Sequence, residues 1–218
     1  MRQNENELRR SRGRPQIRSD EETRELLVQA AAEAFSASGY AGTCMATVAQ
    51  TAGISTKTMY RLIPTKAELF TAVVARQISE FMLTTDDSIL ADLPLEEALQ
   101  QILVAYGTLT LNEETIALFR LVIGESERFP EVAAVFYETA ITRVGATIED
   151  WLRRQVKLGR IEVEDPAVAT SMLRGMLIMD VQRGAMLGQR PAPDAQEIAE
   201  RARACAKVFL DGCRTRAH

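Results

Sequence analysis

A run of hydroxyl and cationic side chains between positions 55 and 61 holds the groups of this sequence best suited to chemistry. Its members are Ser55, Thr56, Lys57, Thr58, Tyr60 and Arg61. Hydroxyls, phenols and cations donate hydrogen bonds to phosphate oxygens, and a lysine can also donate to O6 and N7 of guanine. The run therefore predicts contacts to DNA, with Lys57 reading a base and Tyr60 binding a phosphate. A place for Tyr60 in the core is the alternative.

Acid–base and metal chemistry have few candidate groups in this chain. His218, the only histidine, is the last residue, and histidine is the usual proton carrier near neutral pH. The three cysteines show neither a CxxC pair nor the ligand spacing of a zinc site, and they are Cys44, Cys205 and Cys213. We expect no catalytic site, no metal and no cofactor. The cysteines are interpreted as buried or incidental thiols, with a redox sensor as the alternative.

Charge is distributed unevenly along the chain. The net charge is −4, but residues 1–70 carry +2, which leaves −6 for the remainder. Six arginines are concentrated at the start of the sequence, and they are Arg2, Arg9, Arg10, Arg12, Arg14 and Arg18. We interpret residues 1–18 as a basic arm that contacts DNA, Arg14 included, with a solvated tail as the alternative.

Helical patterns extend over almost the whole sequence. Apolar residues recur at spacings of three and four, and no alternating run indicates a β-strand. The predicted N-terminal caps are Ser19, Thr43, Ser55, Thr65, Asn112, Asp165 and Asp194. With Pro and Gly stops, the predicted helices cover residues 19–39, 43–52, 55–62, 65–86, 94–110, 112–124, 130–158, 165–187 and 194–211. The predicted fold class is all-α, with about nine helices.

The polar run lies on the second of two short helices. These helices, predicted over 43–52 and 55–62, are joined by a turn at Gly53. This is the helix-turn-helix arrangement, whose second helix can enter the major groove of DNA. We therefore predict a helix-turn-helix domain over residues 19–70, after the arm, and a larger helical domain for ligand binding and dimerisation over residues 71–218.

Several motifs in register resemble the TetR/AcrR family of regulators. They are Gly13-Arg14-Pro15, Ala31, Phe35, Gly39-Tyr40, Thr43, Ala49, Ala52-Gly53, Tyr60, Lys66, Leu69 and Phe70. Cys44 and Ile63 depart from the usual residues at positions that affect local packing. Lys57 departs as well, so no relative's operator sequence is carried over. The resemblance implies operator DNA as the partner and a phosphate contact at Lys66, for which a plain surface charge is the alternative. The predicted DNA contacts are Arg14, Thr43, Thr47, Ser55, Thr56, Lys57, Thr58, Tyr60, Arg61 and Lys66.

A second resemblance lies in the larger domain. The segment LFRLVIGESERFPEVAAVFYE, from Leu118 to Glu138, is similar to the AefR-like C-terminal type of that family. It implies a helical effector domain without naming a ligand. The family resemblance also implies that the last two predicted helices pair with their copies in a homodimer. A role only in covering the monomer's own core is the alternative.

Large side chains on the helices of this domain are candidates for a ligand pocket. Most are interpreted as core, with a subset lining a cavity, because bundle interiors are common places for ligand pockets. The candidates are Phe81, Leu103, Tyr106, Phe119, Arg120, Ile123, Phe136, Trp151, Met172, Met176 and Met179. Arg120 is the charged member, which would pair with Glu125 or a ligand's acid group, or would face solvent.

Together these patterns predict a cytoplasmic, homodimeric DNA-binding regulator. We expect a repressor that a small apolar or amphipathic effector releases from a near-palindromic operator; an activator or a regulator without an effector is the alternative. A helical ligand carrier or an enzyme would need a site that this histidine-poor sequence does not offer. No membrane is expected, because no apolar stretch approaches the roughly 20 residues of a spanning helix and residues 1–18 contain no secretory pattern.

Overall fold

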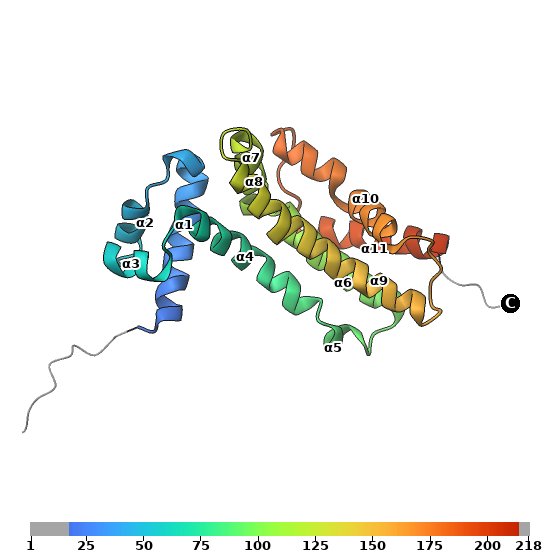
Figure 1. The fold of residues 1–218 in the computed structure, drawn as a ribbon. Helices are drawn as coiled ribbons and strands as arrows, with labels where there is room; N and C mark the ends of the chain where they lie inside the picture. The colour runs from blue at the N-terminus through green and yellow to red at the C-terminus, as the bar shows by residue number, and fades with distance from the viewer. Residues whose placement is uncertain (1–17, 214–218) are drawn as a thin grey trace, which may run out of the picture.

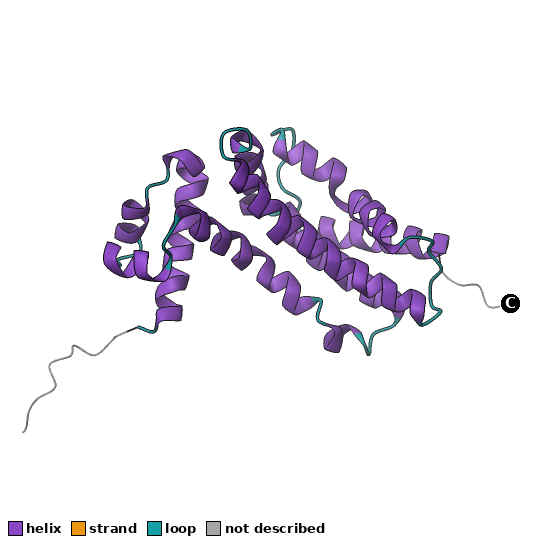
Figure 2. Ribbon diagram, in the orientation of Figure 1, coloured by secondary structure: helices purple, strands orange, loops and turns teal. Residues whose placement is uncertain are grey.

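Residues 18–213, the part of the chain that this computed structural model describes, fold into helices joined by short loops (Figures 1 and 2). The helices are α1 (Asp20–Gly42), α2 (Met45–Thr51), α3 (Thr56–Leu62), α4 (Lys66–Thr84), α5 (Asp87–Leu90), α6 (Leu95–Leu111), α7 (Glu113–Glu125), α8 (Pro130–Phe136), the π-helical turn η1 (Tyr137–Thr142), α9 (Arg143–Lys157), α10 (Pro166–Met186) and α11 (Ala195–Cys213). The predicted all-α fold class is confirmed.

The predicted helix over 130–158 is present as one rod made of α8, η1 and α9. Its central turn has π-helical hydrogen bonding, a geometry that is frequent at functional sites and that the sequence pattern did not predict. The short α5 was not predicted either. With the rod counted as one helix and α5 set aside, the described residues form the nine predicted helices.

Side-chain caps fix most helix starts where the sequence predicts them. Ser19 accepts a hydrogen bond from the Glu22 amide at 3.1 Å, while the Glu22 carboxylate accepts one from the Ser19 amide at 2.7 Å. The other confirmed caps are Ser55, Thr65, Asn112, Asp165 and Asp194. Each cap satisfies a backbone amide that has no partner within the first turn of its helix.

The prediction that Thr43 caps α2 is wrong. Gly39 adopts a left-handed conformation with φ of 69° and interrupts α1. The Thr43 hydroxyl donates to the Gly39 carbonyl oxygen at 2.7 Å, so this side chain serves the end of α1. Cys44 occupies the N-cap position of α2 instead.

Two hydrophobic cores share α4, the helix that runs from one end of the molecule into the bundle (Figure 1). The first core packs α1, α2, α3 and the first half of α4 against α7 and α8. The second packs the other half of α4 with α6, α9, α10 and α11. The domain boundary predicted between residues 70 and 71 therefore falls inside a continuous helix. None of the described helices is both long and apolar enough to cross a membrane.

Candidate nucleic-acid interface and ligand cavity

The helix-turn-helix consists of α2, a tight turn and α3. Gly53 adopts φ of 69° in the turn, and the Ile54 amide donates to the Ala49 carbonyl oxygen at 2.9 Å. Ala49 and Met59 are fully buried and hold the two helices together. Leu62, the last residue of α3, is buried as well. The other side chains of α3 and its cap lie at the surface: Thr58 is half-buried, and the exposed residues are Ser55, Thr56, Lys57, Tyr60 and Arg61.

Tyr60 and Arg61 lie at the outer surface of α3. Tyr60 is 49% exposed, which contradicts the alternative of a core tyrosine. The Arg61 guanidinium donates to both carboxylate oxygens of Asp20, at 2.8 and 2.7 Å. These hydrogen bonds lower the pKa of Asp20 and raise that of Arg61. The start of α1 and the end of α3 are thereby joined at this surface.

Lys66 is held in place at the first turn of α4. Its ammonium group donates to the Ala41 carbonyl oxygen at 3.3 Å and lies 4.8 Å from the centre of the Tyr40 ring. That ring packs in turn against Phe35 and Phe70. Partial burial lowers the pKa of Lys66 through desolvation. The candidate phosphate-binding cation is therefore positioned by α1, a support that sequence reasoning missed.

The other predicted DNA contacts differ in their surroundings. Thr47 is exposed in the first turn of α2. Thr43 is buried with its hydroxyl bonded to α1, and this burial contradicts a contact between its side chain and DNA. Arg14 lies outside the described residues. Cys44 is exposed near this surface, whereas Cys205 and Cys213 are half-buried, so their interpretation as incidental thiols, or as a redox sensor, stays a prediction.

A small cavity of about 40 Å³ lies inside the larger domain, and we call it the inner cavity. It is lined by side chains from α4, α6, α7, the α8–η1–α9 rod and α10. Three predicted pocket residues line it, namely Tyr106, Phe119 and Phe136. Ala140 and Ile141 of η1 form part of its wall, so the π-helical turn borders this space.

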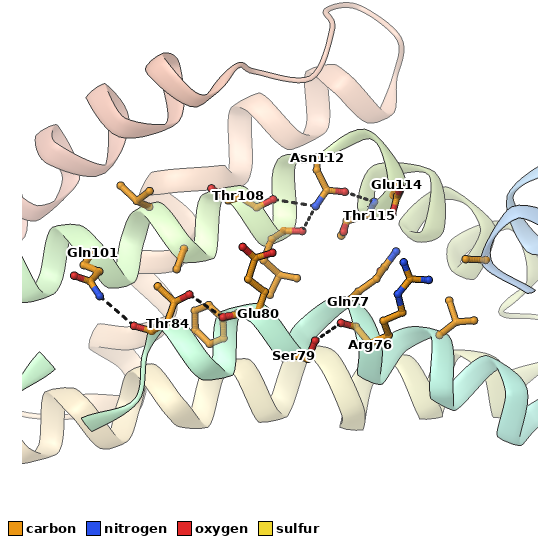
Figure 3. A pocket seen from close by; sticks show the side chains of 16 residues that line it. Arg76, Gln77, Ser79, Glu80, Thr84, Gln101, Thr108, Asn112, Glu114 and Thr115 are labelled. Carbon is orange, nitrogen blue, oxygen red and sulfur yellow. Dashed lines mark hydrogen bonds between the residues drawn. The ribbon is translucent and has the colours of Figure 1, made fainter. Parts of the chain in front are cut away.

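A larger cleft of about 650 Å³ opens between α4 and α6 and reaches the start of α7 (Figure 3). Phe81, another predicted pocket residue, lines this cleft rather than the inner cavity. Arg76 and Glu80 of α4 also line the cleft. Gln77 and Thr115 line both the cleft and the inner cavity, so the two spaces adjoin.

The remaining predicted pocket residues lie elsewhere. Leu103 and Trp151 are buried in the second core without lining the inner cavity. Ile123 is exposed on the outside of α7. Three methionines of α10 are exposed as well, and they are Met172, Met176 and Met179. These methionines line neither the inner cavity nor the cleft, so neither space supports their assignment to a pocket.

Arg120 is not the charged group of the cavity. It donates to the Ala185 and Met186 carbonyl oxygens at 2.5 and 2.8 Å, and so caps the end of α10. The arginine that lines the cavity is Arg174, which sequence reasoning missed. Its Nε donates to the Tyr106 hydroxyl at 3.0 Å. A charged residue within the apolar sequence of α10 was the pattern that could have identified it.

This arrangement combines an exposed polar recognition helix with a cavity-bearing helical bundle, which defines a helix-turn-helix DNA-binding regulator. The chain matches the bacterial regulatory proteins of the tetR family over residues 27–73. It matches the C-terminal domain of AefR-like transcriptional repressors over residues 97–212, more than half of its length. The chain therefore belongs to the TetR family of transcription regulators, with an AefR-like C-terminal domain, and is not an enzyme.

The chain is also similar to individual regulators and to their structures. A TetR-family regulator of Mesorhizobium loti MAFF303099 is 28% identical, with a TM-score of 0.77 over 91% of this chain and 100% of that structure. The flavonoid-responsive regulator FrrA is 24% identical, with a TM-score of 0.70 over 90% of this chain and 100% of that structure. The HTH-type regulator YhgD of Bacillus subtilis is 23% identical over 184 residues, which are 81% of this chain and 90% of YhgD.

Proposed function

We propose that this TetR-family regulator is a homodimeric repressor that leaves a near-palindromic operator when a small apolar or amphipathic effector binds. The matched C-terminal domain is that of transcriptional repressors, which supports repression over activation. The inner cavity and its adjoining cleft support control by a ligand. Repression then ends when ligand binding lowers the affinity of the dimer for its operator.

The exposed face of α3 supports different roles for the proposed DNA contacts, with some reading bases and others binding phosphates. Lys57 is exposed and, within the described residues, has no hydrogen-bond or ion-pair partner, so its ammonium group is available to a base edge. Tyr60 and the supported Lys66 are suited to phosphate oxygens, which set the position of a protein on DNA without reading sequence. Recognition therefore depends chiefly on Lys57 in this proposal.

An apolar stripe on α10 supports dimerisation through the last two helices. Val168, Met172, Met176 and Met179 are all exposed, at spacings of three and four that bring them to one face of the helix. A contiguous apolar surface of this kind indicates a protein interface. Pairing of α10 and α11 with their copies covers the stripe and places two recognition helices under one two-fold axis.

The continuity of α4 is the observation that carries ligand control. Lys66 begins this helix beside the helix-turn-helix, and Val74, Gln77 and Ile78 of the same helix line the inner cavity. A ligand that widens the cavity displaces α4 and moves α3 with it. Half-sites on one face of DNA lie roughly 34 to 36 Å apart, so a change in the spacing of the two recognition helices opposes simultaneous docking.

Thermodynamic linkage provides the test of ligand control. Compounds that raise the melting temperature of the protein would be titrated against the free dimer and against the operator-bound dimer. An inducer is expected to bind the free protein about 5- to 150-fold more tightly, and operator DNA should weaken ligand binding by the same factor. Stabilising compounds that bind both forms equally would contradict the proposed release mechanism.

A further inference from the structure

We propose that the effector is an organic anion with an apolar body, whose carboxylate binds Arg174 in the inner cavity. This inference rests on the proposed ligand-responsive function and specifies the class of its ligand. Three residues on three different helices carry it: Arg174, Gly145 and Thr115.

Arg174 reaches the cavity from α10 through a space that Gly145 leaves in α9. A Cβ atom added at Gly145 would lie 2.8 Å from Nη1 of Arg174, and within 4 Å it would meet only the Arg174 guanidinium. The absence of a side chain at Gly145 therefore admits the guanidinium. Its orientation is fixed by the hydrogen bond from Nε to the Tyr106 hydroxyl and by the Tyr106 ring, whose centre lies 5.2 Å away.

No carboxylate neutralises Arg174 among the residues that the structure describes, and within that part of the chain its terminal nitrogens have no hydrogen-bond acceptor. Tyr106 supplies no counter-charge, because burial raises the pKa of its phenol and keeps it neutral. Arg174 is half-buried, so part of its guanidinium remains open to solvent or a ligand, and full burial against the apolar wall without a counter-charge would be unfavourable. A ligand carboxylate would supply the missing charge and accept two parallel hydrogen bonds from the guanidinium.

Thr115 presents a second polar group that lacks a partner. Its side chain is 5% exposed and lines the inner cavity, and its hydroxyl has no hydrogen-bond partner within the described residues. A buried hydroxyl in this state destabilises the protein, so natural structures usually satisfy it. A ligand oxygen or a water bound with the ligand can do so at this position.

The other residues that line the inner cavity are the reason for proposing an apolar body for the ligand. Ile78, Phe119, Phe136 and Val144 line the inner cavity. Its volume of about 40 Å³ is far below the roughly 300 to 1,000 Å³ of ordinary ligand pockets. The adjoining cleft of about 650 Å³ supplies the missing space beyond Gln77 (Figure 3). A carboxylate at Arg174 would thus be followed by an alkyl or aryl body that extends past Gln77.

Calorimetric titration of the full chain with matched acids and esters tests this inference. The probes are decanoate with methyl decanoate for an alkyl body, and cinnamate with methyl cinnamate for an aryl body. At least one acid is expected to bind, with its ester about tenfold weaker or more. Arg174→Gln should weaken the acid roughly 10- to 100-fold while leaving the ester unchanged. Arg143→Gln, an exposed position on α9, serves as the matched control.

Gly145→Ala provides a second variant that keeps the charge and favours the helix. Its added Cβ displaces the guanidinium, so it should weaken acid binding while leaving the melting temperature of the free protein unchanged or higher. Three results would each overturn the inference. Acid and ester could bind equally well, neither acid could bind, or acid binding could be lost in Arg76→Gln and kept in Arg174→Gln.

Measurements of operator binding distinguish a failure of the carboxylate inference from a failure of the proposed function. Arg174→Gln should bind operator DNA as the wild type does, and an acid that releases the wild type should no longer release the variant. If acids and esters release the wild-type protein equally well, ligand control stands and the carboxylate inference fails. If an acid binds through Arg174 but never weakens operator binding, the carboxylate inference stands and the proposed release mechanism fails.

Discussion

The Asp20 carboxylate accepts two hydrogen bonds from the Arg61 guanidinium, at 2.7 and 2.8 Å, across 41 positions of the sequence. This pair joins the first turn of α1 to the last turn of α3, the recognition helix. Both side chains are about half exposed, so solvent screens their attraction. The pair is therefore expected to orient the recognition helix while adding little to the overall stability.

Asp20→Asn is expected to make stability less dependent on acid pH. Hydrogen bonds from Arg61 hold the folded-state pKa of Asp20 below its usual value of about 3.9. A lowered folded-state pKa gives stability that is present above the unfolded-state pKa and is lost as the pH falls through the folded-state pKa. Melting temperatures near neutral pH should be slightly higher for the wild type. The difference should begin to shrink below about pH 4 and should vanish once the pH lies below the lowered folded-state pKa of Asp20. A difference that grows in acid would contradict the pairing.

Two lysine variants should alter DNA binding in different ways. Lys66→Ala removes a cation held by the Ala41 carbonyl and the Tyr40 ring, so it should weaken binding to every duplex and reduce the salt slope by about one. Lys57→Ala should relax the base preference at one half-site position, and it should cost about 1 to 3 kcal/mol of binding free energy on the best operator. Fluorescence anisotropy on a set of single-base operator variants measures the affinity and the base preference of each lysine variant. Equal losses on all sequences for Lys57→Ala would show that it reads no base.

Met176→Glu should weaken dimerisation and operator binding together. It places a charge in the middle of the apolar stripe of α10, where the proposed interface would bury it. Leu83→Glu is the matched control, since Leu83 is an exposed apolar residue on α4. Analytical ultracentrifugation should show the monomer fraction rising only for Met176→Glu. A dimer that survives this change would place the interface elsewhere.

Arg120→Gln should destabilise the larger domain without changing the ligand class. The variant removes two hydrogen bonds to the Ala185 and Met186 carbonyl oxygens at the end of α10. A charged cap at a helix C-terminus is worth about 1 kcal/mol, which corresponds to roughly 2 to 4 °C in melting temperature for a chain of this size. Differential scanning calorimetry with Arg143→Gln as control measures the change. An unchanged melting temperature would show that the two hydrogen bonds contribute nothing to stability.

Local sequence patterns predicted the helix starts because the interactions that form them are local. Ser19, Ser55 and Asp165 bond to amides two or three residues ahead, so their role is visible in a short window of sequence. Thr43 failed as a cap because Gly39 interrupts α1 and the Thr43 hydroxyl bonds backward to it. The π-helical turn over 137–142 has an ordinary helical composition and gave no separate pattern.

The cavity could not be predicted as fully, since it depends on contacts between distant helices. Arg174 becomes a cavity residue only because Gly145, on another helix, leaves room for its guanidinium. The methionines of α10 have the same apolar character as core residues, so sequence did not separate an inward side chain from an outward one. Met172, for example, has an apolar side chain like those of the core but is 64% exposed. The exposed face of α3 was more predictable, because Met59 and the turn at Gly53 fix which side of this helix faces outward.

Titration of the purified protein onto the DNA upstream of its own gene tests the central claim most directly. Fluorescence anisotropy at physiological salt would compare this duplex with a scrambled duplex of equal length and composition. The account predicts saturation at two chains for each palindromic site, with an affinity about 1,000-fold or more above that for the scrambled duplex. Equal affinity for both duplexes at every salt concentration, or no binding to either, would contradict it.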